Sequence, residues 1–102
     1  MINTVLNGDC LDQMRSIEQG SIDLIYLDPP FFTERKHTLK NRERTKEFSF
    51  DDSWGSDRGY AEFLKKRIEV MHSLLSETGS IFAHCDKSGE HIVRAILDQV
   101  FG

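Results

Sequence analysis

Cysteine is scarce in this 102-residue chain and stands at two distant positions, Cys10 and Cys85. Neither belongs to a Cys-x-x-Cys pair, so the sequence offers neither a disulfide framework nor the ligand spacing of a zinc site. The four histidines share no i, i+4 spacing, so no metal site is expected. Few cysteines and no secretory leader pattern are typical of a reducing cytoplasm, where we expect this chain to reside.

Long apolar runs are also missing from the sequence. No stretch approaches the roughly 20 apolar residues that a membrane-spanning helix needs. Hydrophobic residues make up 38% of the chain and charged residues 29%, proportions that are ordinary for a soluble globular protein. The length allows one domain with a modest core, which we place over residues 1–102.

The chain lacks an excess of positive charge, since its net charge is −4 and gives no overall reason to expect nucleic-acid binding. The charge is nevertheless uneven, because residues 34–47 carry +3 and the remainder carries −7. Two interpretations of this basic stretch stay open. In the first, the stretch is a solvated loop. In the second, it contacts DNA phosphates, and the candidate residues for these contacts are Arg35, Lys36, Arg42 and Arg44.

Apolar periodicity predicts that strands and helices alternate along the chain. Strands are predicted over 2–7, 22–27 and 81–85, and helices over 10–17, 57–75 and 88–101. Asp57 and Ser88 are the predicted helix caps, and residues 78–80 the predicted turn into the last strand. The segment 31–57 shows no period and is interpreted as a long active-site loop. The order β-α-β-loop-α-β-α predicts an α/β fold with a mostly parallel sheet and flanking helices.

Polar residues follow the predicted strands at their carboxyl ends, where ligands of parallel α/β sheets bind. Asp9 follows the first strand, Asp28 the second, and His84 to Asp86 the third. We therefore expect the site at this rim of the sheet. His84 and Asp86 either line the pocket or form structural hydrogen bonds.

The chain has two prolines, and they stand side by side in "LIYLDPPFFTERKH", directly after the apolar run 22–27. An exocyclic amino group of a nucleobase is a poor nucleophile until two acceptors take its N–H groups. The Asp28 carboxylate and a backbone carbonyl held by consecutive prolines supply two such acceptors. The aromatic ring of Phe31 would stack on the base for about 1–3 kcal/mol, after the base has flipped out of the duplex. The alternative is that Asp-Pro-Pro merely ends a strand.

Three segments in order resemble the amino-terminal part of a DNA amino-methyltransferase: "NGDCLDQMRSIEQGSIDLIYLDPPFFT", "FSFDDSWGS" and "GSIFAHCD". The match is to the permuted, beta-type arrangement, in which the catalytic motif precedes the cofactor glycine motif. The resemblance implies a partial Rossmann-like fold, with Asp28 and the Pro29 carbonyl accepting from the target amino group. It also implies that Pro30 keeps the turn rigid and that Phe31, more often tyrosine in the family, stacks on the base.

The cofactor implied by this resemblance is S-adenosylmethionine. Asp9 and the backbone of Cys10 would contact its adenine, and Asp28 would lie beside it. An aspartate at position 28 is similar to the adenine-N6 enzymes, whereas the cytosine-N4 enzymes more often carry serine there. Double-stranded DNA is the implied substrate, with adenine N6 as the favoured target and cytosine N4 as the alternative.

The sequence departs from the family in one respect, because its seven glycines form no Gly-x-Gly turn. In the permuted order that turn lies downstream, so we interpret the chain as an amino-terminal part that is inactive alone. The strand 22–27 is apolar on both faces and would lack a neighbour, so we expect self-association through the open sheet or a complementing carboxyl-terminal chain. The competing hypothesis is a non-catalytic remnant or subunit that binds DNA or a partner.

Overall fold

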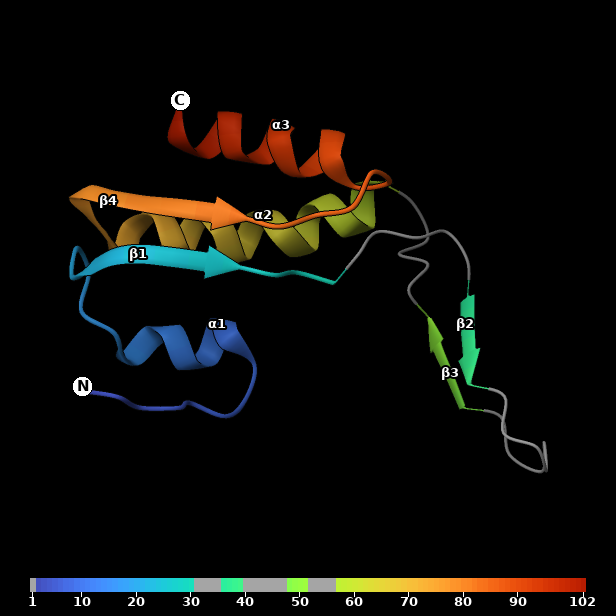
Figure 1. The fold of residues 1–102 in the computed structure, drawn as a ribbon, viewed down its shortest axis with the longest axis horizontal. Helices are drawn as coiled ribbons and strands as arrows, with labels where there is room; N and C mark the ends of the chain where they lie inside the picture. The colour runs from blue at the N-terminus through green and yellow to red at the C-terminus, as the bar shows by residue number, and fades with distance from the viewer. Residues whose placement is uncertain (1, 31–35, 40–47, 52–56) are drawn as a thin grey trace.

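The computed structural model describes residues 2–30, 36–39, 48–51 and 57–102, and Figure 1 shows their arrangement. The elements are α1 (Cys10–Gln13), the 3-10 helix η1 (Met14–Ser16), β1 (Ile22–Leu27), β2 (Lys36–Leu39), β3 (Phe48–Asp51), α2 (Asp57–Leu74), β4 (Leu75–Ala83) and α3 (Glu90–Phe101). A parallel pair of strands is combined with helices that precede, connect and follow it, so the predicted α/β fold is confirmed.

A parallel pair of strands, β1 and β4, forms the centre of the domain. The crossover between parallel strands needs a long connection, and here it includes the helix α2. Leu24 pairs with Ser80, and Leu27 pairs with Ala83. The backbone N–H of His84 donates to the carbonyl of Leu27 at 2.8 Å, which continues the ladder past the last residue of each strand.

The beginning of β4 corrects two sequence-based boundaries. The strand starts at Leu75 directly after α2, whereas Leu75 was expected in the helix and residues 78–80 were expected to form a turn. The register shifts there, because Ile22 pairs with Leu75 while Leu24 pairs with Ser80. A Cβ on Gly79 would lie 2.8 Å from Cδ2 of Leu75 and 2.9 Å from the carbonyl oxygen of Ile22. The glycine therefore permits a close backbone contact inside the strand rather than a turn before it.

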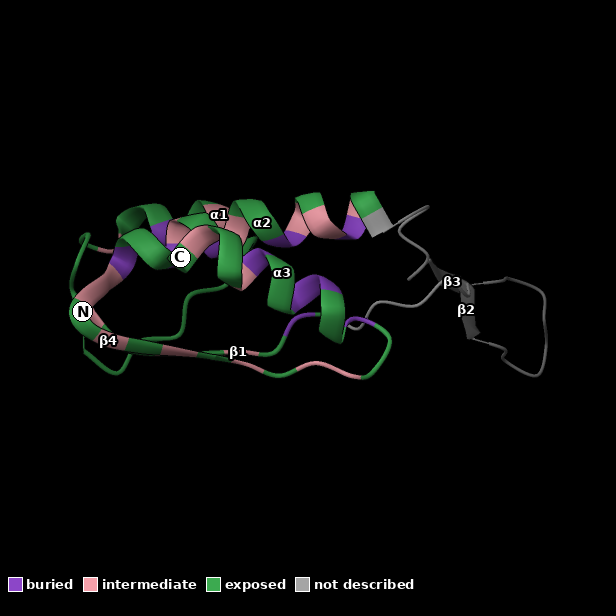
Figure 2. Ribbon diagram, turned by 90° about the horizontal axis from the view of Figure 1, so that it is seen from above, coloured by how far each residue is buried: buried purple, intermediate pink, exposed green. Residues whose placement is uncertain are grey.

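The helices α1, α2 and α3 lie on one side of the β1-β4 pair, as Figure 2 shows. The i, i+3, i+4 pattern predicted in the long helix is confirmed, since its apolar residues enter two core clusters. The larger cluster contains Tyr60, Leu64, Ile68, Ile92, Val93 and Ile96. The smaller cluster contains Met14, Met71 and Leu74. Burying each such side chain contributes about 1.5–3 kcal/mol, so these clusters fix α2 and α3 against the sheet.

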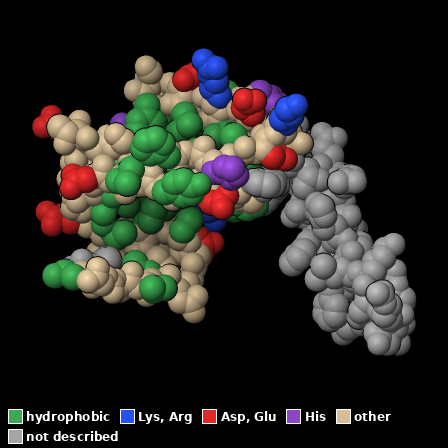
Figure 3. All heavy atoms as spheres, viewed as in Figure 1, with side chains coloured by type: hydrophobic (Ala, Val, Ile, Leu, Met, Phe, Trp, Pro, Cys, Tyr) green, Lys and Arg blue, Asp and Glu red, His purple; other side chains and the backbone are tan. Residues whose placement is uncertain are grey.

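The opposite side of the same two strands is uncovered in the part of the chain that the structure describes. Leu24, Tyr26 and Phe82 point to this side and are 61%, 69% and 59% exposed. Figure 3 views this surface, on which hydrophobic side chains gather. We call these three residues the open sheet face. The residues that alternate with them, such as Ile25 and Ile81, pack against the smaller cluster. The strand 22–27, which is apolar on both faces, is therefore covered on one face only by the described residues.

The predicted strand over 2–7 does not form. Asn3 adopts a left-handed conformation with φ of 49°, which breaks the extended backbone. Val5 is 92% exposed, and no strand among the described residues pairs with this segment. A strand needs a neighbour for its N–H and C=O groups, so apolar composition alone does not make one.

Two further details differ from the sequence-based expectations. The N-cap of α3 is Gly89 rather than Ser88, and no side chain caps it. Within the segment 31–57, expected to be irregular, β2 and β3 form an antiparallel pair. The alternation in "FSF" at 48–50 is the period-two signal that could have predicted β3. Among the described residues, no helix is both long enough and apolar enough to cross a bilayer.

Candidate active site

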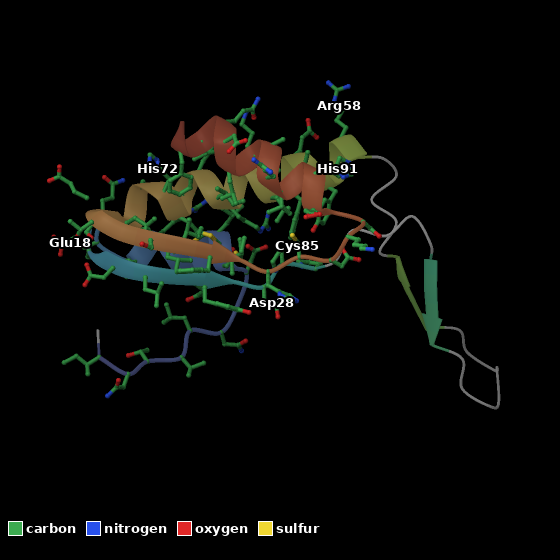
Figure 4. All side chains as sticks on the ribbon, turned by 45° about the horizontal axis from the view of Figure 1, so that its top comes forward. Glu18, Asp28, Arg58, His72, Cys85 and His91 are labelled. Atoms are coloured by element: carbon green, nitrogen blue, oxygen red, sulfur yellow. The ribbon has the colours of Figure 1, made fainter. Side chains whose placement is uncertain are left out.

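The turn Asp28-Pro29-Pro30 follows the carboxyl end of β1, which lies beside the carboxyl end of β4. The hydrogen bond from His84 N–H to the Leu27 carbonyl holds the two strand ends together. Figure 4 shows Asp28 and Cys85 at this end of the sheet, and Glu18 at the other. The structure therefore brings Asp28 next to the His84 to Asp86 group, as expected from the parallel pairing.

The Asp28 carboxylate is exposed, and no side chain or backbone group among the described residues hydrogen-bonds to it. Pro29 is buried and Pro30 is exposed. The turn is thus anchored at its middle residue, while its carboxylate stays available to accept hydrogen bonds from a ligand. Phe31 and the basic residues Arg35, Arg42 and Arg44 lie outside the described residues, and Lys36 is described only as the first backbone position of β2.

Tyr60 is a residue of this site that sequence reasoning assigned only to the core. Its hydroxyl donates to the Pro30 carbonyl at 2.6 Å, and its side chain is 1% exposed. Burial, followed by the nearby Asp86 and Cys85, raises the pKa of Tyr60 to about 12, so the hydroxyl stays protonated and able to donate. The available signal was a tyrosine at a buried helix position, because a buried phenolic hydroxyl usually has a hydrogen-bond partner.

The Asp9 carboxylate is already engaged by the protein itself. It accepts from the backbone N–H of Leu11 at 2.8 Å, which caps α1. It also forms an ion pair with Arg67, whose Nη2 lies 3.2 Å from Oδ2 and 3.3 Å from Oδ1. The side chain remains 51% exposed, so it keeps acceptor capacity on its open side. Figure 1 shows α1 beginning at the same end of the molecule at which β1 and β4 end.

Arg67 was missed by the sequence reasoning. Its side chain is 15% exposed, its Nη1 donates to the Phe63 carbonyl at 3.0 Å, and its guanidinium carbon lies 3.8 Å above the Phe63 ring centre. The guanidinium is therefore held in one orientation toward Asp9. Its spacing in the sequence could have predicted this position. Arg67 lies four residues after Phe63 and three after Leu64, on the apolar stripe of α2.

The group that follows β4 is mainly structural. The Asp86 carboxylate accepts from the backbone N–H of Gly89 at 3.3 Å, which shapes the turn into α3. Burial, then Glu90 and Asp86, raises the pKa of the Cys85 thiol, which keeps it protonated and a poor nucleophile. The described residues contain no cluster of three metal-ligating side chains. Of the two open interpretations of Asp86, the hydrogen-bonding one agrees with these contacts.

The residues at this rim suit an adenine ring. An adenine presents an N–H donor at its exocyclic amine and an acceptor at the neighbouring ring nitrogen. The Asp9 carboxylate is a matching acceptor, and the backbone N–H of Cys10, the first residue of α1, has no acceptor among the described residues. The donor set therefore fits the adenine of S-adenosylmethionine. The fold is thus an α/β domain with polar residues at the carboxyl ends of its parallel strands, where sheets of this kind bind ligands.

The chain belongs to the N6/N4 DNA methylase family. The sequence model of this family, described as DNA methylase, matches residues 22–102, which is most of the chain. This membership confirms the Rossmann-like fold class and the DNA methyltransferase class that the resemblance implied.

Individual relatives point to the same class. The type II methyltransferase M.HinfI of Haemophilus influenzae is 36% identical over 85 residues, which cover 79% of this chain and 23% of the relative. The type II methyltransferase M.EcaI of Enterobacter cloacae is 30% identical, over 84% of this chain and 18% of the relative. A probable type III restriction-modification enzyme HindVI Mod subunit of Haemophilus influenzae is 26% identical, over 97% of this chain and 12% of the relative. The chain thus spans less than a quarter of each of these relatives.

Proposed function

We propose that this chain carries the catalytic turn of an S-adenosylmethionine-dependent DNA methyltransferase of the permuted, beta type. The target is the exocyclic amino group of a flipped base, with adenine N6 favoured by the aspartate at position 28. One observation supports this proposal above the others. The exposed Asp28 carboxylate, which accepts no hydrogen bond among the described residues, stands at the carboxyl end of a parallel strand and is followed by an anchored Pro-Pro backbone.

The lone pair of the amino nitrogen is delocalised into the ring of the base. The reaction requires this lone pair to be localised on the nitrogen. Asp28 accepts one N–H and the Pro29 carbonyl accepts the other, which turns the nitrogen toward tetrahedral geometry. The Asp28 carboxylate also stabilises the positive charge that develops on nitrogen as the N–C bond forms, and can then take the released proton. Pro30 keeps the turn rigid, and Phe31 stacks on the flipped base.

Asp9 and the Cys10 N–H would hold the adenine of S-adenosylmethionine, and Asp28 would lie beside the same cofactor. When bound, the cofactor supplies an electrophilic methyl group on a positively charged sulfur. Arg67 orients the Asp9 carboxylate and takes up two of its lone pairs, which directs the remaining ones outward. Because the proposed substrate is DNA, the proposed location of this chain is the cytoplasm.

Arg35, Lys36, Arg42 and Arg44 are the proposed DNA contacts, made with phosphates rather than with base edges. They follow the catalytic turn in sequence, within residues 34–47, which carry a net charge of +3. Contacts of this type add affinity that depends on salt and carry no sequence information.

The test is nucleoside analysis of DNA treated with labelled S-adenosylmethionine and a polypeptide that carries these residues. We expect the label in N6-methyladenine. Label in N4-methylcytosine would support the proposed methyltransferase activity and would change the proposed target from adenine N6 to cytosine N4. Label in neither nucleoside, from both this chain and a polypeptide extended to the length of its relatives, would contradict the proposed function.

A second candidate is carried by the open sheet face. Leu24, Tyr26 and Phe82 expose three large apolar side chains on adjacent strands, an arrangement that typically marks an interaction surface. In this candidate the chain binds a complementing carboxyl-terminal chain, or a second copy of itself, and contributes no catalysis. Light scattering of the parent and of a Phe82→Thr variant tests this surface, because a monomeric parent chain would remove the support for self-association through it.

A further inference from the structure

The Asp28-Pro29-Pro30 turn has one backbone torsion that its own sequence leaves loose. The proline rings fix φ at Pro29 and Pro30. A residue before proline is restricted in ψ, so Asp28 and Pro29 are both limited to extended values. Pro30 precedes Phe31, and its ψ angle, which sets the direction of its carbonyl, has no such restriction.

Tyr60 supplies the missing restraint. Its hydroxyl donates to the Pro30 carbonyl at 2.6 Å, across 30 positions of sequence. Its ring lies in the larger core cluster with Leu64 and Ile68, and Leu27, the residue before the turn, packs against the same cluster. The donor is therefore fixed to the framework that also holds the end of β1. Its pKa of about 12 keeps the proton on the hydroxyl at neutral pH.

The same bond joins the two sides of the segment 31–57. Pro30 is the last residue before this segment, and Tyr60 lies in the first turn of α2 directly after it. The hydrogen bond thus fixes both ends of the proposed active-site loop to one point beside Asp28.

We propose that Tyr60 is a positioning residue for methyl transfer, whose hydroxyl anchors the Pro30 carbonyl and so fixes the Asp28-Pro29-Pro30 turn, with both acceptors, to the core. This inference rests on the proposed function of the turn. Tyr60 does not touch the reacting atoms. Its contribution is to keep the turn, with its two acceptors, in one place beside the end of β4, which matters because small displacements of reacting groups are costly.

Tyr60→Phe is the direct test, because it removes the hydroxyl and keeps the ring in the core. In a polypeptide that carries these residues and methylates DNA, we expect kcat to fall about tenfold with the KM values for DNA and cofactor within about twofold. The matched control is Ser73→Ala on the same helix, which removes an exposed hydroxyl that donates to the Val70 carbonyl, away from the turn. We expect its kcat to stay at the parental value. An unchanged kcat in Tyr60→Phe would overturn the proposal.

A second measurement reports on the structure of the turn and does not depend on methyl-transfer activity. The chain has two prolines, so labelling proline carbonyls with ¹³C gives two resonances, those of Pro29 and Pro30. We expect Tyr60→Phe to shift the Pro30 resonance and Ser73→Ala to leave both in place. No shift in Tyr60→Phe would show that the bond is not made. A parent polypeptide without transferase activity would instead contradict the proposed function, and the carbonyl resonance would still decide whether Tyr60 holds the turn.

Discussion

Two carboxylates at the same end of the molecule, Asp9 and Asp28, differ in what surrounds them. Asp9 accepts from the Leu11 N–H and from Arg67, so its position is fixed by the protein. Asp28 is exposed and makes no hydrogen bond among the described residues, although the turn beside it is held through Pro30 and Tyr60. A carboxylate that is already paired suits the binding of a ligand edge, whereas an unpaired one on a rigid turn suits a reacting group. The comparison predicts different consequences for the same substitution at the two positions.

In a polypeptide that carries these residues and methylates DNA, Asp28→Asn is expected to lower methyl transfer by roughly 10- to 150-fold without changing the fold. An amide is a weaker acceptor and can present a donor, and a hydrogen bond to a charged group is worth about 1.5–3 kcal/mol. The measurement is the single-turnover rate with labelled cofactor. Asp98→Asn, an exposed aspartate on α3, makes the same change of charge away from the turn and is expected to keep the parental rate. A rate for Asp28→Asn within about threefold of the parent would remove the role assigned to Asp28.

The anchoring of the turn predicts a pH dependence of stability. The pKa of Tyr60 is raised from 10.0 to about 12 in the folded chain, so the folded state holds this proton more tightly than the unfolded state. The stabilisation is complete below about pH 10 and is lost as the pH rises through about 12, by about 2–3 kcal/mol. Urea unfolding at several pH values measures it. Tyr60→Phe lacks the titrating group, so its stability should fall less over this range, and equal falls would contradict the prediction.

The Arg67 ion pair predicts a smaller loss. Arg67→Met is expected to lower the free energy of unfolding by about 1–2 kcal/mol, because it removes charged hydrogen bonds to Asp9 and the contact over Phe63. Arg58→Met on the same helix is the control. Its pair with Glu62 spans 4.0 Å between side chains that are 87% and 69% exposed, so we expect a change within about 0.5 kcal/mol. Equal losses in urea unfolding would show that the Arg67 pair is an ordinary surface contact.

The basic stretch is expected to affect DNA binding and to leave transfer unchanged at saturating DNA. Alanine at Arg35, Lys36, Arg42 and Arg44 removes phosphate contacts, so fewer counterions are released on binding. Affinity should fall similarly for any duplex sequence, and its dependence on salt should become shallower. Fluorescence anisotropy over a series of salt concentrations measures both. An unchanged salt dependence would assign these residues to a solvated loop.

The sequence predicted the helices better than it predicted the strand boundaries. Apolar spacing in α2 depends on local geometry, so Tyr60, Leu64 and Ile68 were placed correctly in the core. Strand formation depends on a neighbour, which explains why residues 2–7 satisfied the pattern and formed no strand. The close contact of Gly79 with Ile22 depends on the partner strand in the same way.

For the site, sequence motifs identified Asp9 and Asp28, and parallel pairing brought Asp28 to the His84 to Asp86 group. The side chains that hold these carboxylates or their turn, Arg67 and Tyr60, come from the face of α2 that patterning assigns to the core. Their polar ends reach partners 58 and 30 positions away, and no local pattern encodes such a distance.

The most direct test of the difference between the two carboxylates is the transfer rate of a polypeptide that carries these residues and methylates DNA, measured as the concentration of S-adenosylmethionine is raised to saturation. We predict that Asp9→Asn, which keeps a good helix cap and weakens the cofactor contact, recovers the parental rate at saturation. Asp28→Asn should stay at least tenfold slower however much cofactor is added. Full recovery of Asp28→Asn at saturation would show that Asp28 acts by binding the cofactor, and it would contradict the assignment of the reacting carboxylate.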